Sequence, residues 1–240
     1  MTIATPLAAF AGRRAAAPAP LSYARAAGWR PGLGSAAIHA ELIAPACEAS
    51  GAGLALAFAR EAAGAGERPW LWVQDLQAIR LGGRPYGPGL PDALRRGLVH
   101  VAAKSAEDAL FALEEGVRCR DLAFVIGELA GNPRALDFTA SRRLSLAAER
   151  HGIPLWVVRL GAARDLSSAR QRWEVRAAPS LAPRWNAQAP GKAAWHAELF
   201  RARAHPPGEW ILRVLRDGLS TSGLDPSSGR SEARESARSW

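Results

Sequence analysis

The sequence predicts an α/β fold in which helices flank a mostly parallel sheet that ends in antiparallel strands at its C-terminal end. Two observations carry this prediction. Between residues 35 and 170, short apolar runs typical of buried strands alternate with helical patterns, an order that produces parallel strands with right-handed crossovers. After residue 170 only strand-like runs remain. The chain has 240 residues, 48% of them hydrophobic, so it can bury a full core and is not disordered throughout.

The continuous apolar run at residues 122–126 indicates a central strand covered on both faces, and it is one of five strands expected in the parallel part. In order they are residues 38–43, 70–73, 98–102, 122–126 and 155–158. The expected helices are residues 51–63, 106–115 and 137–150. The first helix is apolar nearly all round, which is typical of a buried helix, and Gly152 with Pro154 ends the third. Glycine and proline make residues 82–91 a loop.

The sheet is expected to finish with three strands, at residues 173–176, 197–203 and 210–214. The last two are joined by His205-Pro206-Pro207-Gly208, a hairpin signal, so they should be antiparallel.

One domain is therefore predicted over residues 35–217, between two less ordered ends. Residues 1–34 are rich in alanine, proline and glycine and carry four arginines without an acidic residue, which predicts a flexible basic arm. Residues 218–240 are rich in serine and arginine and predict a disordered tail.

Charge and composition exclude several classes of protein. The net charge is +9 and the sequence pI is about 11.0, which permits nucleic-acid or acidic-protein partners. No apolar run reaches the ~18 residues of a membrane span, and the first arginines follow the N-terminal apolar run instead of preceding it. These features predict a cytoplasmic protein without a membrane partner. Two cysteines and five scattered histidines predict no metal site.

The first strand, a small-residue loop and the first helix form the usual setting of a phosphate-binding loop, GxxxxGK[ST]. The second glycine of this motif is present as Gly51, but Ala46 replaces the first glycine. Ala52 replaces the lysine, and Gly53 replaces the Ser/Thr. Without the lysine that contacts the outer phosphates and the hydroxyl that binds Mg²⁺, ordinary ATP hydrolysis is not expected. The sequence therefore predicts no catalytic residue and no cofactor at this degenerate loop.

A second nucleotide signature is also incomplete. Nucleotide-binding strands of this type consist of four apolar residues followed by an aspartate, whereas Phe124-Val125-Ile126 is followed by Gly127 and Glu128. The carboxylate comes one residue late, so strand alternation would turn Glu128 to the opposite face of the sheet. We interpret this segment as the structural end of a strand.

Clustered arginines give the remaining candidate for function, a surface for a partner protein or DNA. Arg201 and Arg203 alternate on one expected strand and should share a face, and arginine beside tryptophan suits a protein interface or a stacked nucleic acid. The alternative is a solvated basic face with Trp173 in the core. The candidate residues identified from charge alone are Arg142, Arg143, Arg170, Arg172, Trp173, Arg201 and Arg203.

Several longer motifs occur in a specific order. They include residues 38–42 before the degenerate loop, 71–74 on the second strand, 136–144, 168–173 and 198–203. In this order and spacing, the chain resembles the RecA-like (P-loop NTPase-type) fold, and more closely the ImuA family of SOS-inducible mutagenesis proteins. The resemblance covers about residues 32–217.

The resemblance implies a role in damage-induced, error-prone translesion DNA synthesis. The implied partners are an ImuB-like Y-family polymerase homologue, an error-prone C-family polymerase and RecA. It also assigns the catalytic glutamate of active relatives to about Leu76, beside Asp75. The two DNA-binding loops of active recombinases correspond to residues 128–135 and 161–167, both short, and the second retains Arg164, which joins the candidate surface.

We therefore expect a non-catalytic accessory protein that bridges translesion polymerase components, with a basic surface for either a partner protein or DNA. Two alternatives stay open from the sequence. One is a weak DNA-stimulated ATPase in which Glu128 or Asp75 holds Mg²⁺. The other is a SulA-like inhibitor of a cell-division protein, which would have a similar fold.

Overall fold

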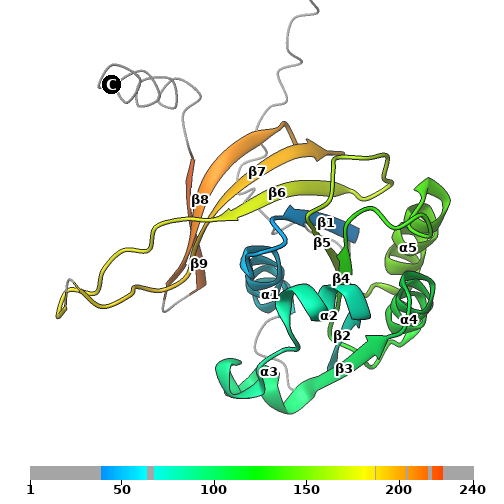
Figure 1. The fold of residues 1–240 in the computed structure, drawn as a ribbon, viewed down its shortest axis with the longest axis horizontal. Helices are drawn as coiled ribbons and strands as arrows, with labels where there is room; N and C mark the ends of the chain where they lie inside the picture. The colour runs from blue at the N-terminus through cyan, green and yellow to red at the C-terminus, as the bar shows by residue number, and fades with distance from the viewer. Residues whose placement is uncertain (1–38, 64–67, 187, 204, 216–217, 224–240) are drawn as a thin grey trace, which may run out of the picture.

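The computed structural model describes residues 39–63, 68–186, 188–203, 205–215 and 218–223. The basic arm predicted for residues 1–34 lies outside these described residues. Within them, a single sheet of nine strands runs through the molecule in the order β3-β2-β4-β5-β1-β6-β7-β8-β9 (Figure 1). All pairs from β3 to β6 are parallel and the pairs from β6 to β9 are antiparallel. The predicted mixed α/β sheet is confirmed.

The strands follow the predicted apolar runs closely. Their bounds are β1 His39–Ala44, β2 Trp70–Asp75, β3 Leu98–Ala103, β4 Val125–Ala130, β5 Leu155–Leu160, β6 Gln171–Ala177, β7 Ala194–Ala202, β8 Gly208–Leu215 and β9 Gly218–Gly223. Strands β1, β2 and β5 are buried at every residue, as continuous apolar runs covered on both faces should be. β4 begins three residues later than predicted, because the hydrogen-bonded ladder with β5 starts at Val125.

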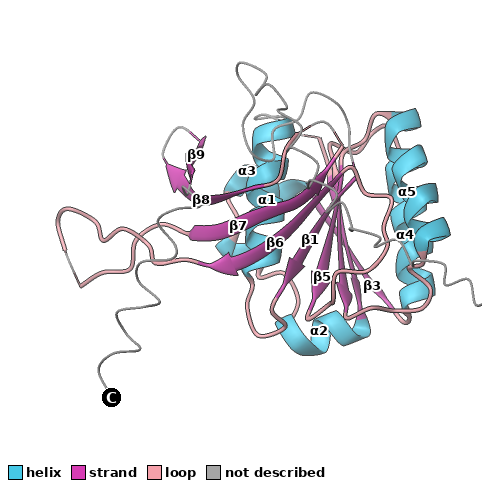
Figure 2. Ribbon diagram, turned by 90° about the horizontal axis from the view of Figure 1, so that it is seen from above, coloured by secondary structure: helices cyan, strands magenta, loops and turns pink. Residues whose placement is uncertain are grey.

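Helices cover both faces of the parallel part. The helices are α1 Ser50–Ala63, α2 Leu76–Gly82, α3 Asp92–Gly97, α4 Ala106–Arg118 and α5 Phe138–His151, with a short 3-10 helix at Gly87–Gly89. α4 and α5 pack on one face, and α1 and α3 lie on the other (Figure 2). Each face has its own hydrophobic core. All six buried tryptophans of the described residues lie on the α1 side, and the α4–α5 side is built from aliphatic residues.

The helix ends have clear local causes. Asp75, Ser105 and Asp137 each accept a hydrogen bond from the backbone N–H three residues later, and so begin α2, α4 and α5. Gly152 takes a left-handed conformation (φ 71°) and ends α5, as predicted, because glycine adopts positive φ without steric cost.

Three elements were not expected from the sequence. α2 and α3 are short helices, and composition alone carries little signal at that length. The tail predicted from residue 218 is wrong for its first six residues. These residues pair with β8 as β9 and bury Leu219, so tertiary pairing overrides their Ser/Gly composition. Residues 224–240 lie outside the described residues. Among the helices described, none is long and apolar enough to cross a membrane.

Candidate functional site

Four of the predicted surface arginines meet at one hollow, which we call the basic pocket. It has a volume of about 470 Å³ and lies between α5, the segment 167–170 before β6 and the end of β7. Its lining consists of Phe138, Arg142, Leu146, Ser167, Ser168, Ala169, Arg170, Arg201, Ala202 and Arg203. Sequence reasoning missed the two serines and the apolar residues of this lining.

Helix α5 supplies one wall of the basic pocket through a single stripe. Phe138, Arg142 and Leu146 are spaced four residues apart and therefore lie on one helical face. All three are exposed, although Phe138 and Leu146 are large and apolar. The i, i+4, i+8 spacing of two apolar residues around an arginine is the sequence signal that could have identified this wall.

A β-bulge brings Arg201 to the pocket. The β6–β7 register shifts between Arg172 and Trp173: Trp173 lies opposite Leu199, whereas Arg172 lies opposite Arg201. The extra residue, Phe200, changes the side-chain alternation at this point. Arg203 follows the end of β7, and its N–H donates to the Arg170 carbonyl at 3.0 Å. Arg201 and Arg203 thus line the same pocket, as predicted from their spacing.

The basic pocket has an excess of positive charge. Arg170 is paired with Glu149, and this hydrogen bond holds the pKa of the Glu149 carboxyl below its ordinary value. Arg142, Arg201 and Arg203 take part in no ion pair with any described residue. Guanidinium groups beside exposed apolar side chains can bind an anionic group and an apolar group of the same ligand.

A buried ion network supports the floor of the pocket. Glu41 on β1 is fully buried, and it accepts hydrogen bonds from Arg172 Nε at 2.9 Å and Ser167 Oγ at 2.7 Å. Asp165 pairs with Arg159 at 3.1 Å and with Arg172 at 3.2 Å. Two carboxylates and two guanidinium groups balance in charge, so the network fixes the segment 165–172 without adding to the charge of the pocket.

The prediction that Arg172 and Trp173 form part of a surface is wrong. Arg172 is 3% exposed because it neutralises Glu41, and Trp173 is 0% exposed. The Trp173 ring packs 5.6 Å from Phe58 and 5.8 Å from Trp210, measured between ring centroids. The part of the alternative interpretation that placed Trp173 in the core is confirmed.

Arg143 and Arg164 are exposed but do not line the basic pocket. Arg143 pairs with Glu114 of α4 at 2.6 Å. Arg164 pairs with Glu174 and Glu198, and its guanidinium carbon lies 4.3 Å from the centre of the Phe200 ring. Both form ion pairs with neighbouring carboxylates, whereas Arg142, Arg201 and Arg203 form none with the described residues.

In the degenerate loop, the glycines serve packing. A Cβ on Gly51 would lie 2.7 Å from the Val158 side chain and 2.8 Å from Ala44, and one on Gly53 would lie 3.3 Å from Trp195. Ala52, at the lysine position, is buried. Ala46, at the first glycine position, lies beside Gly161. These residues let α1 approach the sheet closely.

Acidic groups near this edge of the sheet are also engaged. The Glu48 carboxylate accepts a hydrogen bond from the Ala177 N–H at 2.8 Å, which ties the loop to the end of β6. Asp75 accepts hydrogen bonds from Ala78 N–H at 2.6 Å and Ala130 N–H at 3.3 Å. It lines a second hollow of about 340 Å³ together with Lys104.

Glu128 is buried on the α2 side of β4. It accepts a hydrogen bond from Gln74 Nε2 at 2.7 Å, and burial raises the pKa of its carboxyl. Gly127 packs toward Leu113 of α4, where an added Cβ would lie 2.8 Å from that side chain. The two residues point to opposite faces, as the alternation predicted.

Comparison with known proteins gives one relationship. The chain matches no protein-family model. It is 33% identical over 143 residues to Protein ImuA from two strains of Caulobacter vibrioides, an alignment that covers 55% of this chain and 55% of each relative. The chain thus spans about half the length of the curated relatives that it matches.

Three of the five motifs named for the ImuA resemblance line the basic pocket, whereas residues 71–74 on β2 do not. Residues 136–144 contribute Phe138 and Arg142, and residues 168–173 and 198–203 contribute the remaining arginines. Residues 38–42 contain Glu41, the centre of the supporting ion network. Segments far apart in the sequence therefore build one site.

Proposed function

We propose that the chain is a non-catalytic, RecA-like accessory protein of damage-induced, error-prone translesion DNA synthesis. In this role it bridges an ImuB-like Y-family polymerase homologue and an error-prone C-family polymerase, and it binds one of them through the basic pocket. The observation that carries the proposal is that three motifs of the ImuA resemblance, residues 136–144, 168–173 and 198–203, line this pocket. RecA is a further proposed partner, and DNA is the alternative anionic ligand of the pocket.

The sheet topology supports the RecA-like part of the proposal. The degenerate loop follows β1, which lies between β5 and β6, and the degenerate second motif lies on β4, beyond β5. The parallel part is extended by antiparallel strands β7 to β9. This arrangement places both degenerate motifs near the same carboxyl edge of the sheet, where α/β proteins bind ligands.

The contacts of the degenerate loop support the non-catalytic part. A phosphate at the loop would meet the Glu48 carboxylate, which is already bonded to the Ala177 N–H. The side chain at the lysine position, Ala52, faces the interior. Neither a cation for the outer phosphates nor a hydroxyl for Mg²⁺ is present at the matching positions.

Nucleotide binding can be tested directly by thermal unfolding. The melting temperature should be unchanged at millimolar ATP and Mg²⁺, with or without single-stranded DNA, because a ligand stabilises only the state that binds it. A rise of several degrees would contradict the non-catalytic role and would support the ATPase alternative.

Bridging can be tested by co-purification. A tagged C-family polymerase should retain the ImuB-like protein more strongly when this chain is added, and the chain should be recovered with both. A parallel experiment with RecA tests the third partner. Equal recovery of the two polymerase components with and without the chain would overturn the bridging role.

A further inference from the structure

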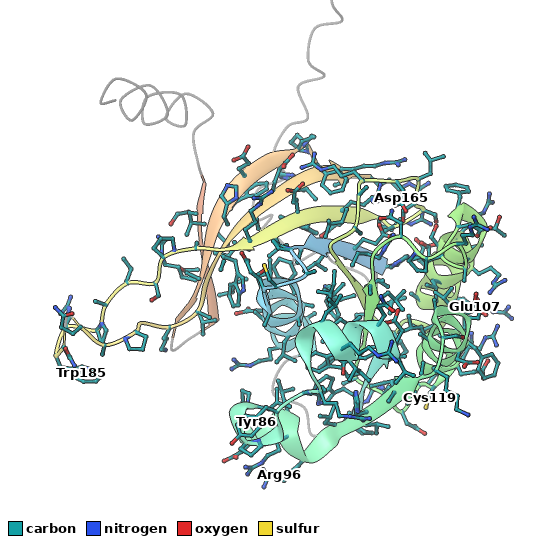
Figure 3. All side chains as sticks on the ribbon, viewed as in Figure 1. Tyr86, Arg96, Glu107, Cys119, Asp165 and Trp185 are labelled. Atoms are coloured by element: carbon teal, nitrogen blue, oxygen red, sulfur yellow. The ribbon has the colours of Figure 1, made fainter. Side chains whose placement is uncertain are left out.

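The connection between β6 and β7 projects from the sheet as a long arm, residues 178–193, of which all but Ala187 are described (Figure 1). The last sheet pair before the arm is Ala177 with Trp195. Beyond it, Ala178 N–H donates to the Ala194 carbonyl at 3.0 Å. The arm then leaves the domain, and Trp185 lies at its far end (Figure 3).

Trp185 differs from every other described tryptophan. The chain has nine tryptophans, and Trp29 and Trp240 lie outside the described residues. Six of the other seven are buried, whereas Trp185 is 82% exposed. Large aromatic side chains gain most from burial, so the exposed Trp185 is the residue of the arm that would gain most from covering by a ligand.

Local hydrogen bonds shape the tip. Asn186 N–H donates to the Pro183 carbonyl at 3.2 Å, which closes a four-residue turn with Arg184 and Trp185 at its two central positions. Ala189 N–H donates to the Asn186 carbonyl at 3.2 Å and starts the return of the chain. A cationic and an aromatic residue are thus consecutive at this turn, and both side chains are exposed.

The base of the arm is closed by a tight backbone contact. An added Cβ on Gly191 would lie 1.9 Å from the Leu181 carbonyl oxygen, so only glycine allows the two sides to approach this closely. Gly191 N–H also donates to Ser180 Oγ at 3.1 Å. The arm is therefore a defined structural feature, held at its base and turned at its tip.

Both charged side chains of the arm are positive. Residues 178–193 contain Arg184 and Lys192 and no acidic residue. Both cations are exposed, and neither takes part in an ion pair with any described residue. An anionic ligand would complement this surface.

We propose that the tip of the β6–β7 arm binds single-stranded nucleic acid, with a base stacked on Trp185 and a phosphate bound by Arg184. Aromatic side chains combined with cations are the usual means of binding single strands without sequence preference, because every base has a π-face. The proposal does not depend on the partner-binding role of the basic pocket. The arm and the pocket have no residue in common.

The shape of the arm favours nucleic acid over a protein partner. A stable protein interface needs roughly 800 Å² on each side, with a ring of contacts around its central aromatic residue. Trp185 lies at a convex turn between the exposed polar residues Arg184 and Asn186. A stacked base needs only the face of one ring and one nearby cation.

The test measures binding of a labelled oligothymidine by fluorescence anisotropy, with the full chain at about 50 and about 200 mM salt. Trp185→Ala should weaken binding by about 5- to 150-fold. Trp185→Phe should restore most of the affinity, since phenylalanine also stacks. Arg184→Gln should lower the steepness of the salt dependence by about 0.7, the value of one phosphate contact on a single strand.

Tyr86→Ala is the matched control. Tyr86 is another highly exposed aromatic residue, on the loop beside α3 and well separated from the arm (Figure 3). This variant should bind like the unmodified chain. Equal affinity of the Trp185→Ala and Tyr86→Ala variants would overturn the proposal, as would no detectable binding of the unmodified chain at low salt.

The nucleic-acid proposal for the arm and the partner-binding proposal for the basic pocket can be tested independently. Trp185→Ala should leave co-purification with the ImuB-like protein unchanged. If this substitution abolished co-purification and left oligothymidine binding intact, the arm would be a protein contact and the nucleic-acid proposal would be wrong.

Discussion

Among single residues, Arg172 differs most from its predicted role. The sequence shows an arginine beside a tryptophan, a pattern that suits an interface. The structure uses Arg172 to neutralise Glu41 in the interior, 2.9 Å away. Arg172 was predicted to be exposed but is buried. Its partner Glu41 lies 131 positions earlier in the chain, and a local run of charged residues does not indicate such a distant contact.

The substitution Arg172→Met should destabilise the protein strongly. It leaves the Glu41 carboxylate buried with only Arg159, at 3.9 Å, as a nearby cation, and loss of one partner of a buried ion pair costs about 3–5 kcal/mol. The free energy of unfolding in urea measures this loss. Arg118→Met removes an exposed arginine paired with Glu115 and should cost no more than about 1 kcal/mol. Equal losses in the two variants would contradict the buried network.

His39 should make stability depend on pH. Burial, the largest effect, lowers the pKa of its imidazole to about 4, with Arg170 and Arg172 also lowering it and Glu41 opposing them. The unfolded chain then binds more protons than the folded protein between about pH 4 and the ordinary value of 6.5. Stability is therefore lost as pH falls through this range, by about 3 kcal/mol.

Unfolding in urea at several pH values tests this prediction. His39→Gln should flatten the dependence between pH 6.5 and 4. His151→Gln, at the end of α5 and not fully buried, is the control and should keep the dependence of the unmodified chain. An unchanged slope in His39→Gln would show that His39 is not the group responsible.

At the scale of elements, the degenerate loop shows that glycines of a nucleotide motif can have a packing role. Gly51→Ala places a Cβ 2.7 Å from Val158 and 2.8 Å from Ala44. Overpacking of this kind costs about 1–3 kcal/mol, which exceeds the gain in helix propensity of at most about 1 kcal/mol. Thermal or urea unfolding should show a net loss of stability.

Gly87→Ala is the matched control for this substitution. Nothing lies within 4 Å of a Cβ at Gly87, so its stability should stay close to that of the unmodified chain. A Gly51→Ala variant as stable as Gly87→Ala would contradict the packing role of Gly51.

Most strands and the longer helices were predictable from the sequence, because buried parallel strands read as continuous apolar runs. The C-terminal hairpin was predictable from its Pro-Pro-Gly connection. α2 was not predictable because it depends on a cap at Asp75. β9 was not predictable because it depends on pairing with β8. The basic pocket was half predictable: its arginines were identified by charge, but their convergence depends on the bulge at Arg172 and on the docking of α5.

At the scale of the whole molecule, two charged features lie on separate parts of the fold. The basic pocket is formed where α5 meets the beginning of β6 and the end of β7. The β6–β7 arm begins at the opposite ends of the same two strands. One strand pair thus carries a proposed protein site at one end and a proposed nucleic-acid contact at the other, an arrangement suited to a protein that brings a polymerase component to DNA.

Partner binding at the basic pocket can be tested with two variants, Arg142→Glu and Arg143→Glu. Titration calorimetry measures the affinity of each variant for the ImuB-like protein. The two arginines are neighbours on α5 and give the same change in charge, but only Arg142 lines the basic pocket. Arg142→Glu should weaken binding at least about tenfold, and Arg143→Glu should leave it nearly unchanged, because Arg143 does not line the basic pocket. Equal affinities for the two variants would contradict partner binding at the basic pocket.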